Sequence, residues 1–154
     1  MVGDSIDVTE EMQDEADEKK NEAIDKFREG NYAETVTLLT EAIKLNPIYA
    51  MVYAKRASCY VNLLCPNAAI KDSNKSLELN PDSALAYKFK RIAIKLLGNL
   101  MKDIEPKAKY FHDQLGVGDY NQTAHSNENT DRKLCELLKF PCHKIYKNSF
   151  IGYS

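Results

Sequence analysis

The stretch Ala42-Ile43-Lys44-Leu45-Asn46-Pro47 returns further along the chain as Ser76-Leu77-Glu78-Leu79-Asn80-Pro81. The two prolines are 34 residues apart, and the same interval separates Tyr53 from Tyr87. A fixed period of this length is typical of stacked supersecondary units, so the sequence predicts a repeat protein.

Apolar residues between these landmarks recur at helical spacing. One stripe follows i, i+4, i+7, i+8 and i+11, namely Tyr53, Ala57, Tyr60, Val61 and Leu64. Each Asn-Pro pair should end a helix, because the residue before proline is pushed out of the helical region. A period of 34 with two antiparallel helices per unit is that of the tetratricopeptide repeat. We therefore predict an all-α fold, a tetratricopeptide-repeat (TPR) helical hairpin array.

The expected helices span about 10–29, 32–45, 48–64, 67–79 and 83–97. The glycine and asparagine at positions 98 and 99 should break the last of them. We expect four segments: an acidic flexible leader (1–9), the TPR domain (10–98), a short basic C-terminal helix (99–112) and a flexible tail (113–154) with a short helix over 131–139.

The third unit departs from the repeat pattern. The position where the first helix of a unit crosses the second needs a small side chain, and Ala23 and Ala57 supply it in the first two units. The third unit has Arg91 there, and burying a guanidinium without a partner is costly. Pro106 falls where the second helix should run, and an interior proline costs about 3 kcal/mol. We predict two full repeats and a damaged third.

Charge is unevenly distributed along the 154 residues, whose formal net charge is -2. Residues 1–18 contain eight acidic residues and no Lys or Arg. No apolar run approaches the roughly 20 residues that a membrane helix needs, and the first residues do not resemble a secretory signal. We therefore expect a cytoplasmic protein with no membrane partner.

No pattern indicates catalysis, a cofactor or a metal. Six residues separate Cys135 from Cys142, whereas structural zinc pairs are separated by two to four. Cys59 lies within a predicted helix and has no recognisable base nearby. There is no Cys-x-x-Cys, phosphate-binding loop or Ser/His/Asp pattern. Lys residues are dispersed among acids, so we expect no nucleic-acid binding and no enzyme activity.

The sequence resembles one known protein family over more than the repeat pattern itself. The sequence resembles the Hsc-interacting protein family over about residues 8–98, and the match is specific from Tyr53 to Ala84. The matching stretches include Val8-Thr9-Glu10-Glu11-Met12, Tyr53-Ala54-Lys55-Arg56-Ala57-Ser58, Pro66-Asn67-Ala68-Ala69-Ile70 and Asn80-Pro81-Asp82-Ser83-Ala84. This resemblance implies a cytosolic co-chaperone that binds the ATPase domain of the heat-shock cognate (70 kDa class) chaperone and stabilises its ADP state. The family's N-terminal dimerisation segment and its C-terminal client-binding modules have no counterpart here, so we do not expect dimerisation or client binding through them.

A rival class of TPR adaptors clamps the chaperone's C-terminal carboxylates with Lys, Asn and Arg side chains. Of the five clamp positions only the first keeps its residue type; the five residues here are Lys20, Ile24, Lys55, Leu85 and Phe89. Without the amides and the guanidinium, the charge-assisted bonds to carboxylates are lost. We expect a more apolar groove, with Ile24, Met51, Leu85, Phe89 and Ile92. The expected partner-binding residues are Lys20, Ile24, Met51, Lys55, Arg56, Lys88 and Phe89. A TPR scaffold for another protein and an eroded paralogue with little activity remain alternatives.

Overall fold

The structure, a computed structural model, describes residues 6–115; beyond Leu100 it describes the backbone of the last helix and the side chain of Lys102. This part of the chain contains no strand and five helices: α1 (Glu10–Arg28), α2 (Tyr32–Leu45), α3 (Ala50–Asn62), α4 (Pro66–Leu79) and α5 (Ala84–Leu115). The expected short helix over 131–139 and all but three residues of the expected tail lie outside the described residues.

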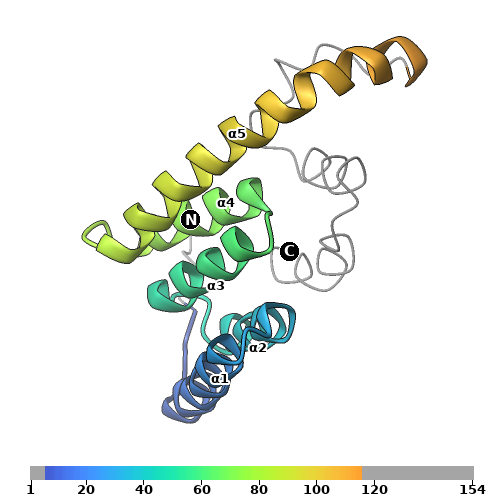
Figure 1. The fold of residues 1–154 in the computed structure, drawn as a ribbon. Coiled ribbons are helices and arrows are strands. Elements are labelled where there is room, and N and C mark those ends of the chain that lie inside the picture. The colour runs from blue at the N-terminus through green and yellow to red at the C-terminus, as the bar shows by residue number, and fades with distance from the viewer. Residues whose placement is uncertain (1–5, 116–154) are drawn as a thin grey trace.

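The helices form two hairpins followed by a single long helix (Figure 1). α1 packs on α2, and α3 packs on α4; the α2–α3 contact joins the hairpins, and α5 packs on α3 and α4. The C-terminal half of α5 runs past the hairpins (Figure 1). The predicted TPR helical hairpin array is confirmed.

Small residues let the helices approach closely, as the repeat pattern requires. Ala23 of α1 and Ala57 of α3 are both fully buried, while Arg91, at the same position of the third unit, is exposed. Most of the core comes from the first four helices, led by Val36, Leu39, Ile43, Val52, Tyr53 and Tyr60.

Hydrogen bonds at the helix ends repeat with the same period. The Thr9 hydroxyl accepts from the Met12 amide at the start of α1. After α2, the Asn46 side-chain oxygen accepts from the Ile48 amide at 3.1 Å; after α4, that of Asn80 accepts from the Asp82 amide, also at 3.1 Å. Each Asn-Pro pair therefore ends its helix in the same turn, as predicted.

The turns inside the two hairpins also match. Gly30, between α1 and α2, has φ +79°, and Leu64, between α3 and α4, has φ 58°. The two positions are 34 residues apart and use the same left-handed backbone. Glycine adopts this conformation without steric cost, whereas leucine is strained in it.

The prediction that a helix ends at Gly98 was wrong, and so was the prediction of a separate basic helix over 99–112. α5 continues without interruption from Ala84 to Leu115, through Gly98 and Pro106. A single interior glycine costs about 1 kcal/mol relative to alanine, which is not enough to end a helix. Pro106 removes one helical hydrogen bond without ending α5. Within the described range the third unit therefore consists of α5 alone; the boundary of the TPR domain at residue 98 stays a prediction.

Candidate protein-binding groove

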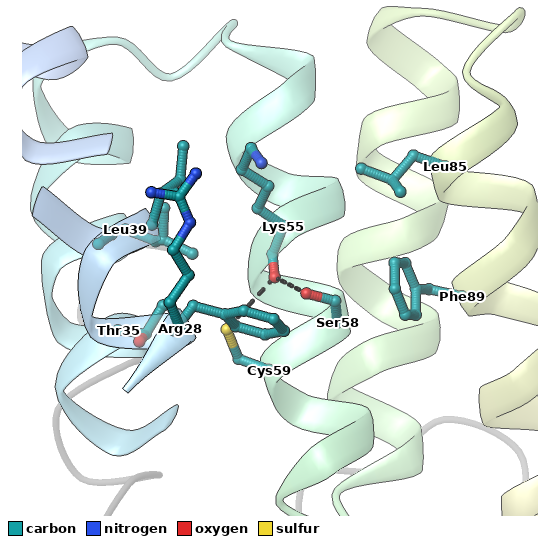
Figure 2. A pocket seen from close by; sticks show the side chains of 11 residues that line it. Arg28, Thr35, Leu39, Lys55, Ser58, Cys59, Leu85 and Phe89 are labelled. Atoms are coloured by element: carbon teal, nitrogen blue, oxygen red, sulfur yellow. Dashed lines mark hydrogen bonds between the residues drawn. The ribbon is translucent and has the colours of Figure 1, made fainter. Parts of the chain in front are cut away.

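A hollow of about 240 Å³ opens where the two hairpins and α5 meet (Figure 2). Four helices line it. α1 contributes Ala23, Ile24, Phe27 and Arg28; α2 contributes Thr35 and Leu39; α3 contributes Lys55, Ser58 and Cys59; α5 contributes Leu85 and Phe89. The hollow therefore lies on the side of the array formed by the first helix of each unit.

Apolar side chains dominate the walls. Leu85 and Phe89 are one helical turn apart on α5 and extend toward α3 in Figure 2. On the opposite wall the ring of Phe27 meets that of Tyr32 edge to face, with 5.2 Å between centroids. Since Leu85 is 37% exposed in the free chain, a partner's apolar side chain seated here would bury further apolar surface.

The charged groups of the hollow are cations. Among the residues lining it, Lys55 and Arg28 are basic and none is acidic. Arg28 forms an exposed ion pair with Asp25 at 3.1 Å, whereas the half-buried Lys55 forms no ion pair with any residue between 6 and 100. The Lys55 ammonium is therefore free to meet a carboxylate of a partner.

The floor of the hollow is chemically inert. The Ser58 hydroxyl donates to the Lys55 carbonyl oxygen at 2.6 Å, and the Cys59 thiol points to the same oxygen at 3.4 Å (Figure 2). Burial raises the pKa of the Cys59 thiol to about 12. A thiol that stays protonated near neutral pH is a poor nucleophile, so Cys59 acts here as a packing residue.

Lys20 lies near the middle of α1 and does not line the hollow. Its ammonium donates to Asp17 Oδ1 at 2.5 Å and to the Tyr49 hydroxyl at 2.7 Å, and the Tyr49 hydroxyl donates to the same Asp17 oxygen at 2.6 Å. The hydrogen bond from Lys20, followed by those from Tyr49 and Gln13, holds the pKa of Asp17 well below its usual range. The one clamp lysine that the sequence keeps is therefore already bonded within the chain.

The expected binding role of Arg56 does not fit its position in the structure. Only 1% of the Arg56 residue is exposed. Its guanidinium donates from Nε and Nη2 to the two Asp72 carboxylate oxygens, at 2.7 and 2.8 Å, and from Nη1 to the Thr40 hydroxyl at 3.0 Å. Residue 56 faces the α2 and α4 side of α3 rather than the groove, because Lys55 takes the groove-facing position one residue earlier. Arg56 ties three helices together and is inaccessible to a partner.

The remaining predicted residues lie at the surface. Met51, near the start of α3, is 51% exposed. Lys88 is exposed on α5, with its ammonium 5.5 Å from the centre of the Phe89 ring. The hollow thus unites Ile24, Lys55 and Phe89 of the predicted set, whereas Met51 and Lys88 do not line it.

Sequence reasoning missed seven of the residues that line the hollow: Ala23, Phe27, Arg28, Thr35, Leu39, Ser58 and Cys59. A usable signal was present for Phe27 and Arg28, because they lie three and four residues after Ile24 and so share its helical face. The contribution of α2 had no comparable signal, since every residue expected in the groove lies on α1, α3 or α5.

The described residues contain no cluster of three or more His, Cys, Asp or Glu side chains that could hold a metal ion. None of the helices within this part of the chain is long and apolar enough to cross a membrane.

No protein-family model matches the chain, but curated proteins resemble it. A FAM10 family protein of Arabidopsis thaliana is 48% identical over 126 residues, which are 78% of this chain and 29% of that protein. Hsc70-interacting protein 1 of Drosophila melanogaster is 40% identical over 91 residues, 59% of this chain and 24% of that protein. The TPR repeat-containing thioredoxin TDX of Arabidopsis thaliana is 41% identical over 98 residues, 63% of this chain and 26% of that protein.

These similarities and the two hairpins with matching turns establish the repeat fold. The chain is a TPR protein. The resemblance to Hsc-interacting proteins noted in the sequence is confirmed by the relative that bears that name. This TPR chain spans between about a quarter and three tenths of the length of the three relatives.

Proposed function

We propose that this TPR chain is a chaperone-associated adaptor, and that its groove binds the ATPase domain of the heat-shock cognate chaperone and stabilises the ADP state. The resemblance to the Hsc-interacting protein family supports the partner, and the name of the Drosophila relative, Hsc70-interacting protein 1, agrees with it. Adaptor binding needs no catalytic group, which is consistent with the inert Cys59 on the floor of the hollow.

The observation that carries the proposal is the chemistry of the groove at the clamp positions. Ile24, Leu85 and Phe89 line the hollow at three positions where clamp adaptors need polar side chains. Lys20, at a fourth, is already bonded to Asp17 and Tyr49. Because apolar walls cannot pair with carboxylates, this groove favours the surface of a folded domain over an acidic tail.

The groove residues divide into anchors and steering charges. Ile24, Leu85 and Phe89 would bury an apolar side chain of the ATPase domain, which is where most binding energy is expected. Lys55 at the hollow and Lys88 on α5 would meet acidic groups and speed association, because charges at the edge of an interface mainly steer encounter. Met51 would extend the apolar rim on α3.

Calorimetric titration of the full chain with the isolated ATPase domain, and separately with a peptide of the chaperone's acidic tail, tests the proposal. We expect binding to the ATPase domain, tighter with ADP than with ATP, and none to the peptide. Phe89→Ala should weaken binding more than tenfold, about 1.4 kcal/mol or more. Lys55→Glu should weaken it less and reduce its dependence on salt, whereas Lys44→Glu, an exposed change on α2, should have no effect.

Two other results would give a different function. Binding to the tail peptide alone would show a clamp-type adaptor and overturn the proposal. Binding to neither probe would favour a TPR scaffold for another protein or an eroded paralogue with little activity.

A further inference from the structure

The outward face of α5 differs from the corresponding face of α3. In α3 the side chains of Tyr53, Ala57 and Tyr60 are buried, and α3 packs on α4. Thirty-four residues on, their counterparts Tyr87, Arg91 and Ile94 are all exposed, Tyr87 at 56% and Ile94 at 52%. In the described part of the chain no further helix follows α5 to cover this face.

A basic stripe, defined here as Arg91, Lys95 and Lys102, runs along the open face. All three side chains are exposed, and their spacing of i, i+4 and i+11 places them on one side of the helix. None of the three forms an ion pair with the side chains that the structure describes. Between Ala84 and Lys102 the helix contains no Asp or Glu; its first acidic residue, Asp103, follows directly after the stripe.

The opposite end of the array has a matching acidic stripe. It consists of four exposed glutamates of α1 that form no ion pair within the described residues: Glu11, Glu15, Glu18 and Glu22. Their spacing is i, i+4, i+7 and i+11, so the stripe extends over 11 residue steps, the same as from Arg91 to Lys102. At 1.5 Å per residue both stripes are about 17 Å long.

We propose that the acidic stripe of α1 in one copy of the chain docks on the basic stripe of α5 in a second copy. The two stripes agree in length and in helical spacing and are opposite in charge. They lie on the first and last helices of the array, so two helices of different copies can meet along them. This contact does not use the groove, and it is therefore independent of the proposed chaperone binding.

The symmetry of such a contact determines how it grows. Each copy offers one acidic and one basic stripe, so every docked pair leaves one stripe of each kind free. A contact of this heterologous kind continues into open chains unless a rotation closes a ring. Because it consists of exposed charges, it weakens as salt shortens the screening length from about 30 Å at 0.01 M to about 3 Å at 1 M.

Sedimentation equilibrium of the full chain over a range of concentrations tests the contact. At about 10 mM salt we expect the weight-average mass to rise steadily above the 17.5 kDa of one chain, and at about 500 mM to return to it. Lys95→Glu should weaken association about tenfold or more, whereas Lys44→Glu, which makes the same charge change on α2, should leave it nearly unchanged. Circular dichroism checks that each variant is folded.

Charge exchange between two variants gives the decisive comparison. Arg91→Glu/Lys95→Glu and Glu15→Lys/Glu18→Lys should each be monomeric alone, and an equimolar mixture should associate again, because each reversed stripe then finds its complement. A monomer at every concentration would overturn the proposal. Binding of the wild-type chain to vesicles containing phosphatidylserine, lost in Lys95→Glu without any self-association, would overturn it in favour of a lipid surface.

Discussion

α3 and α5 are the first helices of successive units, yet they differ in how much of their surface is covered. α3 packs on α2, α4 and α5, whereas α5 packs chiefly on α3 and α4 among the described helices. At equivalent positions α3 has the fully buried Ala57 and α5 has the exposed Arg91. The comparison shows that the repeat constrains a residue through its neighbouring helix, and that the constraint disappears at a helix with no such neighbour among the described residues.

The largest expected effect comes from exchanging residue types between these two positions. Ala57→Arg should destabilise the chain by roughly 4 kcal/mol or more, because a guanidinium would be forced between packed helices. Arg91→Ala should change the free energy of unfolding by no more than about 0.5 kcal/mol, since the side chain is exposed. Urea unfolding followed by circular dichroism measures both.

Equal losses of unfolding free energy for the two substitutions would contradict the difference between α3 and α5. If Arg91→Ala also cost several kcal/mol, a covering element would have to pack on α5, and the basic stripe would not be available to another copy.

The next largest effect on stability is the difference between removing a buried cation of α3 and removing a less buried one of α5. Arg56 of α3 is paired with Asp72 and almost fully buried, whereas its counterpart on α5, Lys90, is only half-buried. Arg56→Ala should cost about 3–5 kcal/mol, because it leaves the Asp72 carboxylate without its bidentate partner. Lys90→Ala should cost less than about 1 kcal/mol. A small cost for Arg56→Ala in the same unfolding experiment would show that the ion pair does not hold α2, α3 and α4 together.

Substitution of two glycines by alanine should change the stability in opposite directions. A Cβ at Gly30 or at Gly98 would meet no atom within 4 Å, so only the backbone decides. Gly30 has φ +79°, and Gly30→Ala should destabilise by about 1 kcal/mol. Gly98 lies inside α5, and Gly98→Ala should stabilise it by about 0.5–1 kcal/mol. Destabilisation by Gly98→Ala, seen as a lower Tm, would indicate that α5 is interrupted there.

The smallest effect is the pH dependence of Asp17. The hydrogen bond from Lys20 lowers the pKa of Asp17, so its stabilising contribution is present above the unfolded pKa of about 3.9 and is lost progressively as the pH falls below it. The Asp17 side chain is 38% exposed, which limits the contribution to about 1 kcal/mol. The difference in unfolding free energy between wild type and Asp17→Asn should therefore shrink from pH 6 to pH 2. A constant difference would contradict the assignment.

The sequence predicted the repeated parts of this fold well, because period and turn residues report local structure. Asn46-Pro47 and Asn80-Pro81 located the ends of α2 and α4, and Ala57 located a close helix contact. The course of α5 was not predicted, since Gly98 is a weak helix breaker and nothing in the periodicity showed that the helix would continue.

The groove was predicted only in part, for a related reason. Repeat alignment indicated Ile24, Lys55 and Phe89, which do line the hollow. It could not distinguish Lys55 from its neighbour Arg56, because which of two adjacent cations is buried depends on the distant acid Asp72. Partners of this kind are set by tertiary packing and leave no signal at the level of spacing.

Hydrogen–deuterium exchange of the full chain, with and without the chaperone's ATPase domain, tests most directly whether the groove is the binding surface. We predict that the ATPase domain slows amide exchange in three segments that line the hollow, 23–28, 55–59 and 85–89, and leaves α4 unchanged. Slower exchange confined to α4, or no change in any segment at concentrations that saturate binding, would contradict the account.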